Sequence, residues 1–92
     1  MNRQEILKKT YEIIAEQLGL VLKGNDGVLV PYYRDDPVTE KHSFKLELGA
    51  DSLDMVEIAM ELEDAFDLHI SDNDIESLQT VGDMVKYVEE NI

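Results

Sequence analysis

Apolar residues recur at helical spacing in three separate segments of this 92-residue chain, and no other feature constrains its fold as strongly. Residues 3–18 and 81–90 each place apolar side chains along one side of a helix, and residues 52–66 also repeat apolar side chains at helical spacing. A shorter helix is expected at 72–77, because Ser71 and Asp74 have the spacing of a capping box. We therefore predict an all-α chain, a four-helix bundle with a short third helix.

Residues that start or stop helices define the predicted boundaries. Gly19 follows the first helix and can end it in a left-handed conformation. Asp51 is placed to cap the second helix, and Asp54 adds negative charge to its first turn. Thr80 and Asp83 form a further capping-box pattern before the fourth helix. The second, third and fourth helices therefore each have a start signal.

The helical period fails between residues 20 and 48, where glycines and prolines interrupt the sequence. We predict a long first loop in this segment. Within it, residues 27–33 favour a short extended piece that follows a turn at Asn25-Asp26-Gly27. Because proline cannot donate a backbone hydrogen bond, Pro31 is expected to confine this piece to a sheet edge.

Acidic residues are concentrated in the C-terminal half. Residues 1–46 hold seven basic and seven acidic residues, whereas residues 47–92 hold Lys86 alone against 14 acids. The second half thus accounts for the whole formal net charge of −13. Such a field repels nucleic acid and anionic lipid, and it speeds the encounter with basic protein surfaces. We expect protein partners with Lys and Arg patches and no nucleic-acid partner.

Composition and length exclude several other classes. The chain has no Cys, so it has no disulfide and no thiol of its own. No apolar run approaches the ~20 residues that span a bilayer, and the N-terminus lacks the apolar core of a signal peptide. We expect a cytoplasmic protein without stable membrane insertion, a single domain over residues 1–92, and a monomer.

The predicted second helix has two apolar stripes on nearly opposite sides. The first is a core face made of Met55, Ile58, Ala59, Leu62 and Phe66. The second consists of Leu53, Val56 and Met60, and it is flanked by Glu57, Glu63 and Asp64. A domain of this size can hardly bury both stripes, so the second is a predicted contact patch with an acidic rim. The alternative is that the fourth helix or the long loop covers it.

Ser52 lies where the predicted loop turns into the second helix. The first turn of a helix presents unpaired backbone N–H groups and a positive dipole end, which favour an anion by about 0.3–1 kcal/mol. Serine is also a common helix-start residue with no further role. The sequence around it makes Ser52 the candidate functional residue.

The segment Leu48-Gly49-Ala50-Asp51-Ser52-Leu53-Asp54, followed by Val56-Glu57, Glu63 and Phe66, resembles the acyl carrier protein family. The resemblance covers residues 6–20 and 38–92. It implies that Ser52 carries 4′-phosphopantetheine, whose terminal thiol holds acyl chains as thioesters, with Asp51, Leu53 and Asp54 beside it. It also implies a carrier that is not an enzyme. A phosphopantetheinyl transferase would modify it, and acyl synthases, reductases and transferases with basic surfaces would use it.

The resemblance implies roles for residues further from Ser52. The surface that meets partner enzymes would comprise Leu53, Val56, Glu57, Met60, Glu63 and Asp64. The core that opens to take the acyl chain would include Phe44, Leu46, Phe66, Ile70, Leu78 and Val81. The Asp-Ser-Leu-Asp form is more like fatty-acid carriers than peptidyl carriers, with a specialised lipid, polyketide or other acyl-transfer pathway as the alternative. Residues 21–37 have no counterpart in the usual short carrier and form an atypical insertion.

Three other interpretations use the same residues. A serine hydrolase needs a base near Ser52, and the only histidines are His42 and His69. A calcium loop that starts at Asp72 fails, because its sixth position is Ser77 rather than Gly and its twelfth is Asp83 rather than Glu. We therefore expect no metal site. An unmodified acidic protein-interaction module would use the same helix, and only modification at Ser52 separates it from a carrier.

Overall fold

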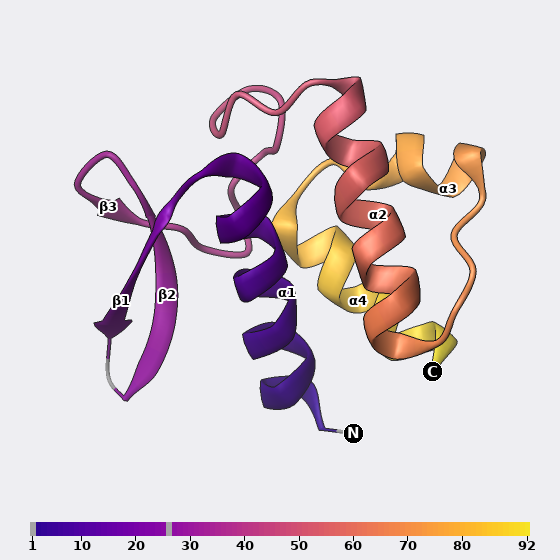
Figure 1. Cartoon of the computed structure of the whole chain (residues 1–92), viewed down its shortest axis with the longest axis horizontal. Helices are drawn as coiled ribbons and strands as arrows, with labels where there is room; N and C mark the ends of the chain where they lie inside the picture. Colours follow the sequence, from indigo (N-terminus) through magenta and orange to yellow (C-terminus); the bar gives the residue numbers. More distant parts are fainter. Residues whose placement is uncertain (1, 26) are drawn as a thin grey trace.

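The computed structural model of the chain describes residues 2–25 and 27–92. Four helices and a three-stranded sheet are present among these residues (Figure 1). The helices are α1 (Arg3–Leu18), α2 (Ser52–Phe66), α3 (Asp72–Ser77) and α4 (Val81–Asn91). The predicted four helices are confirmed, and none of them is long and apolar enough to cross a membrane.

Local signals in the sequence explain where the helices begin and end. The side chain of Thr80 accepts a hydrogen bond from the amide of Asp83, and the Asp83 carboxylate accepts one from the amide of Thr80. Ser71 accepts a hydrogen bond from the amide of Asp74 at the start of α3. Gly19 ends α1 with a φ of 68°, a conformation that costs glycine little. The predicted caps are therefore confirmed.

The prediction of a long first loop is wrong over most of residues 21–37, whereas the extended piece predicted within it at residues 27–33 is confirmed as a strand. This segment forms an antiparallel sheet with the order β1-β2-β3. The strands are β1 (Val21–Asn25), β2 (Val28–Tyr33) and β3 (Asp36–Pro37). Valines and tyrosines dominate β2, and such residues favour strands. The predicted turn between β1 and β2 includes Asp26, which lies outside the described residues.

The predicted edge position of Pro31 is also wrong, because β2 is the central strand. The carbonyl of Pro31 accepts a hydrogen bond of 2.8 Å from the amide of Val38. The nitrogen and oxygen of one residue in a strand point to the same side, so the Pro31 nitrogen also faces away from β1. The pairing of Pro31 with Leu22 in β1 therefore needs no donor from the proline. On the side of Pro31 that faces β3, the strand β3 ends at Pro37. The missing N–H of Pro31 therefore removes little pairing between β2 and β3.

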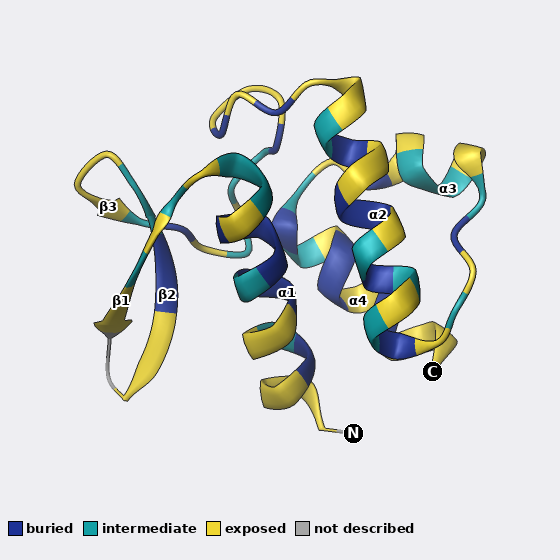
Figure 2. Cartoon of the chain, viewed as in Figure 1, coloured by how far each residue is buried: buried dark blue, intermediate teal, exposed yellow. Residues whose placement is uncertain are grey.

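Helix α1 lies between the sheet and the other helices. It contacts β1 and β2 on one side and α2 and α4 on the other (Figure 1). The faces that meet are buried, and the outward faces are exposed (Figure 2). The largest fully buried side chains of the helices belong to Ile6, Ile14, Ile58, Leu62, Val81, Met84, Val85 and Val88. Val30, Pro31 and Val38 are buried as well, so the sheet segment contributes to the core.

Arg3 links three distant segments at the base of α1. Its guanidinium pairs with Glu40, which follows the sheet, and with Glu89 of α4 at 3.0 Å. The hydrogen bond with Glu40 raises the pKa of Arg3, and the same bond lowers the pKa of Glu40. All three side chains are about a third to a half exposed, so the network contributes modestly to stability.

The sheet's contribution to the core can be tested with two valines of paired strands. Val30→Ala should lower the free energy of unfolding by about 1.5–2.5 kcal/mol, because it removes two buried methyl groups and leaves a cavity. Val21→Ala is the control, since Val21 is 61% exposed and its loss should cost less than about 0.5 kcal/mol. Urea denaturation measures both. Equal losses would mean that the sheet does not pack on α1.

Candidate functional site

Ser52 is the first residue of α2 and is exposed. The helix begins there because Asp51 and Asp54 form a reciprocal capping box. The Asp51 carboxylate accepts a hydrogen bond of 2.8 Å from the amide of Asp54, and the Asp54 carboxylate accepts one of 3.1 Å from the amide of Asp51. The predicted cap at Asp51 is confirmed. No described residue is hydrogen-bonded to the Ser52 hydroxyl, so this group faces solvent.

The capping box leaves part of the helix start open. Asp51 uses its side chain for the amide of Asp54 and its carbonyl for the amide of Met55. The amides of Ser52 and Leu53 lie in the first turn of the helix, where no earlier helical carbonyl is present to accept their hydrogen bonds. An oxyanion attached to Ser52 therefore meets two open N–H groups and the positive end of the helix dipole.

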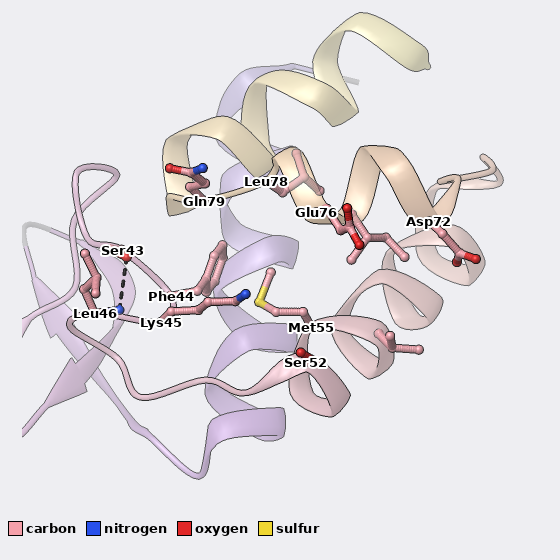
Figure 3. Close-up of a pocket in the computed structure, with 12 residues that line it drawn as sticks. Ser43, Phe44, Lys45, Leu46, Ser52, Met55, Asp72, Glu76, Leu78 and Gln79 are labelled. Atoms are coloured by element: carbon pink, nitrogen blue, oxygen red, sulfur yellow. Dashed lines mark hydrogen bonds between the residues drawn. The ribbon is translucent and has the colours of Figure 1, made fainter.

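A cavity of about 540 Å³ opens beside Ser52 (Figure 3). Its walls come from the loop before α2, from the first turns of α2 and from α3 with the residues after it. Apolar side chains form much of its lining, namely Phe44, Leu46, Met55, Val56, Ile75 and Leu78. The polar side chains of the lining are Ser43, Lys45, Ser52, Asp72, Glu76 and Gln79. The candidate serine therefore borders an apolar cavity.

The structure corrects the list of expected core residues at one position. Phe44, Phe66, Ile70, Leu78 and Val81 are buried, but Leu46 is 90% exposed. Its amide donates a hydrogen bond of 3.2 Å to the Ser43 hydroxyl, which forms a tight turn and directs the Leu46 side chain outward (Figure 3). Leu48, two residues later, is the buried leucine of this loop.

Sequence reasoning missed several residues that line the cavity. Ser43, Lys45, Ile75, Glu76 and Gln79 are more than six residues from Ser52 along the chain. They meet Ser52 only because the loop around Phe44 is fixed to the residues before α4. The amide of Phe44 donates a hydrogen bond of 3.0 Å to the carbonyl of Gln79. No local pattern signals such a long-range contact.

Helix α3 forms one wall of the cavity although none of its six residues is buried. Its attachment includes a hydrogen bond of 2.8 Å from the Tyr87 hydroxyl of α4 to the Asp74 carboxylate. This bond raises the pKa of Tyr87. Few contacts therefore hold α3 in place. Moving α3 outward would expose little buried apolar surface.

The second apolar stripe of α2 faces solvent, as predicted. Leu53 is 65%, Val56 40% and Met60 58% exposed, so neither α4 nor the segment before α2 covers the stripe. The opposite face, including Met55 and Ile58, is buried. Val56 also lines the cavity, so the exposed stripe and the cavity meet at the Ser52 end of the helix.

The three acids beside this stripe have different surroundings. Glu57 accepts a hydrogen bond of 2.5 Å from the side-chain amide of Gln17 in α1. Glu63 accepts one of 2.8 Å from the amide of Ile70, and the ring of His69 lies 3.2 Å from the same oxygen. Asp64 is exposed, and no described residue is hydrogen-bonded to its side chain. Glu63 therefore also holds the loop after α2.

The hydrolase and metal interpretations find no support in the geometry. Among the described residues, neither His42 nor His69 lines the cavity beside Ser52. His42 accepts a hydrogen bond from the amide of Thr39, and His69 is exposed near Glu63. In the described part of the chain, no group of three or more His, Asp or Glu side chains is arranged to hold a metal ion.

The capping box can be tested without reference to function. Asp51→Ala should lower the free energy of unfolding by about 0.5–2 kcal/mol, because the amide of Asp54 loses its partner. Asp64→Ala removes the same charge from the same helix and should change it by less than about 0.5 kcal/mol. Chemical denaturation compares the two variants. An Asp51→Ala variant as stable as Asp64→Ala would show that the cap does not hold the helix start.

Comparisons with known proteins identify the family. Residues 30–88 match the family model of the phosphopantetheine attachment site. An acyl carrier protein from Exiguobacterium sp. strain AT1b is 42% identical over 89 residues, which cover 97% of this chain and 96% of that protein. The solved structure of an acyl carrier protein from Enterococcus faecalis, described for its high thermal stability, covers the whole of both chains with a TM-score of 0.73 and 35% identity. The chain therefore belongs to the acyl carrier protein family, which carries acyl intermediates on a phosphopantetheine group.

Proposed function

We propose that Ser52 is the attachment residue for 4′-phosphopantetheine and that the chain delivers acyl thioesters from it to acyl-synthesis enzymes. The observation that carries this proposal is the apolar cavity that opens beside Ser52. A serine with no role beyond starting a helix has no reason to border such a space. The family match supports the same conclusion, because residues 30–88 include Ser52.

The residues around Ser52 fit this prosthetic group. Its phosphate would meet the open amides of Ser52 and Leu53, where an anion is favoured. The cavity volume of about 540 Å³ lies within the range that small-molecule sites occupy. The bound group supplies the thiol that this Cys-free chain lacks, and the thiol holds an acyl group as a thioester.

The chain's own residues would shelter the acyl group. Phe44, Met55, Ile75 and Leu78 line the cavity and offer an apolar surface. Each methylene that leaves water for such a surface gains about 0.8 kcal/mol. The weak attachment of α3 allows this wall to move outward around longer chains. Neither histidine lies in the described lining beside Ser52, so the imidazole base that a serine hydrolase would use is not placed there, which supports a carrier that leaves the chemistry to other proteins.

The exposed face of α2 supports a role in partner binding. Leu53, Val56 and Met60 would make the apolar contacts next to Ser52, and Glu57, Glu63 and Asp64 would attract basic surfaces. The partners would be a phosphopantetheinyl transferase and acyl synthases, reductases and transferases. Fatty-acid synthesis is the pathway we favour, with a specialised acyl-transfer pathway as the alternative. We further propose a cytoplasmic monomer with a single domain, in which the segment 21–37 is an insertion.

Modification at Ser52 is the direct test of this proposal. When the chain is coexpressed with a phosphopantetheinyl transferase, its mass should rise by about 340 Da, the mass of the covalently attached group. Ser52→Ala should show no gain while its fold is retained, since a lost helix-start hydroxyl costs at most about 1 kcal/mol. Ser43→Ala is the matched control, because it removes another cavity-lining serine and should still gain the mass. Intact-protein mass spectrometry gives the answer.

Two results would contradict the proposal. A Ser52→Ala variant that still gains the mass would place the attachment at another residue. A wild-type chain that stays unmodified with an active transferase would favour the unmodified protein-interaction module, which uses the same acidic helix without a prosthetic group.

The partner surface can be tested by charge reversal. Glu57→Lys combined with Asp64→Lys should slow association with the transferase roughly tenfold at low salt and flatten its salt dependence, because rim charges act mainly on encounter rates. The control, Asp35→Lys with Glu90→Lys, changes the net charge equally at exposed positions outside α2. Stopped-flow kinetics over a salt series compare them. Equal slowing by both pairs would indicate that only net charge matters.

A further inference from the structure

Lys45 shares the cavity beside Ser52 and has no role in the function proposed so far. It follows the buried Phe44 and precedes the exposed Leu46 in the loop that leads to α2. Its side chain extends toward the part of the cavity where Met55 and Ser52 enter from α2 (Figure 3). Lys45 therefore lines the same cavity that Ser52 borders.

The backbone on both sides of Lys45 is fixed. The amide of Phe44 donates a hydrogen bond of 3.0 Å to the carbonyl of Gln79, and the Phe44 side chain is fully buried. The amide of Leu46 donates a hydrogen bond of 3.2 Å to the Ser43 hydroxyl. Lys45 thus reaches the cavity from a defined position rather than from a free loop.

Lys45 is also electrostatically distinctive. It is the only basic residue among those that line the cavity, and after it the sequence contains Lys86 alone against 14 acids. Asp72 and Glu76 line the same cavity, yet the ion pairs among the described residues do not include Lys45. The ammonium group therefore remains available to an anion at the cavity mouth.

A phosphate on Ser52 adds negative charge where the chain is already most acidic. Asp51 and Asp54 flank the attachment residue, and their carboxylates are bonded to each other's amides rather than to a cation. A nearby ammonium offsets this repulsion, and its three donors can hydrogen-bond phosphate oxygens. The lysine at the cavity therefore fits a phosphate ester on Ser52. The neutral hydroxyl of unmodified Ser52 needs no cation beside it.

We propose that Lys45 is a positioning residue that pairs with the phosphate on Ser52 and holds the prosthetic arm toward the cavity. This inference rests on the proposed attachment at Ser52. Without the pairing, the arm is less restrained and turns more often toward solvent and toward the exposed Leu53 and Met60. The pairing thus raises the fraction of acyl chains sheltered between the loop, α2 and α3.

The first test compares the melting temperatures of unmodified and modified protein in four chains: wild type, Lys45→Met, Lys45→Arg and Lys41→Met. Lys45→Met keeps an unbranched stem and removes the charge. The change in melting temperature on modification should be less favourable by roughly 1–6 °C in Lys45→Met than in wild type, the shift expected for one exposed ion pair in a domain of this size. Lys45→Arg should restore the wild-type change. Lys41→Met, which removes an exposed lysine outside the cavity lining, should also match wild type.

The second test measures the position of the arm directly. An octanoyl thioester on the modified chain should react with hydroxylamine about two- to fivefold faster in Lys45→Met than in wild type, the factor that corresponds to one exposed ion pair. Salt at roughly 0.5 M should remove most of this difference by screening. The ³¹P resonance of the phosphodiester should shift in Lys45→Met and not in Lys41→Met.

The outcomes separate the two proposals. If mass spectrometry shows the modification but melting, thioester reactivity and the ³¹P resonance are the same in wild type and Lys45→Met, the role of Lys45 is refuted and the function stands. Failure of Lys45→Arg to restore the wild-type values would also refute a charge-based role. If the wild-type chain gains no mass, the proposed attachment at Ser52 is refuted, and the proposed role of Lys45 is refuted with it.

Discussion

The pair of hydrogen bonds between Asp51 and Asp54 determines where α2 begins, and the site depends on that start. One residue of an α-helix corresponds to a rotation of roughly 100°, so a start shifted by one residue would turn Ser52 away from the cavity. The preceding loop fixes the same point from the other side. The amide of Ala50 donates a hydrogen bond of 2.8 Å to the carbonyl of Phe44, and Gly49 takes the positive φ of 69° that the turn requires. The capping box and the packing of the preceding loop therefore both fix the position of Ser52.

Helix α2 serves two surfaces at once. Its inner face, with Met55 and Ile58, closes the core and part of the cavity, while its outer face presents Leu53 and Met60 to solvent. A small domain gives up buried apolar area when it leaves such a stripe exposed, so the exposure has a cost in stability that a partner-binding role would explain. The high negative charge adds self-repulsion and favours basic partners. Both features lower stability, and both fit the proposed role of this face in partner binding.

The helices could be predicted from the sequence because their signals are local. The ranges of α1, α2 and α3, the capping roles of Asp51, Ser71 and Thr80, and the two faces of α2 all follow from spacing within a few residues. Ser52 could be singled out because residues 48–54 resemble the attachment motif of the acyl carrier protein family, whereas its place at a helix start alone did not distinguish it. Of the sheet, only the extended piece at residues 27–33 could be predicted, because β1 and β3 are short and Pro31 suggested an edge position for what is the central strand. The strand pairing is needed to show that the nitrogen of Pro31 faces away from β1, so that the pairing with β1 requires no hydrogen-bond donor from this proline.

Residue patterns did not predict the cavity, although the family resemblance implied a core that opens for an acyl chain, and Phe44, Leu46 and Leu78 of that core do line it. Its walls join residues 43–46, α2 and residues 72–79, and the contact between Phe44 and Gln79 spans segments far apart in the chain. Periodicity indicates that a residue lies on an apolar face, but it does not indicate which faces leave a space between them. Leu46 illustrates this limit, since the family resemblance implied a core position for it and the turn closed by the hydrogen bond from its amide to Ser43 leaves its side chain exposed.

The central claim is that an acyl group carried from Ser52 enters this cavity rather than lying on the outer face of α2. Two methionines of the same helix report on the two sides, because Met55 lines the cavity and Met60 is 58% exposed on the opposite stripe. The direct measurement is a ¹³C-methyl methionine NMR spectrum of the modified chain with and without an octanoyl thioester. We expect a large shift of the Met55 methyl resonance, nuclear Overhauser contacts between it and the acyl methylenes, and little change at Met60. Contacts to Met60 with an unchanged Met55 resonance would contradict the account.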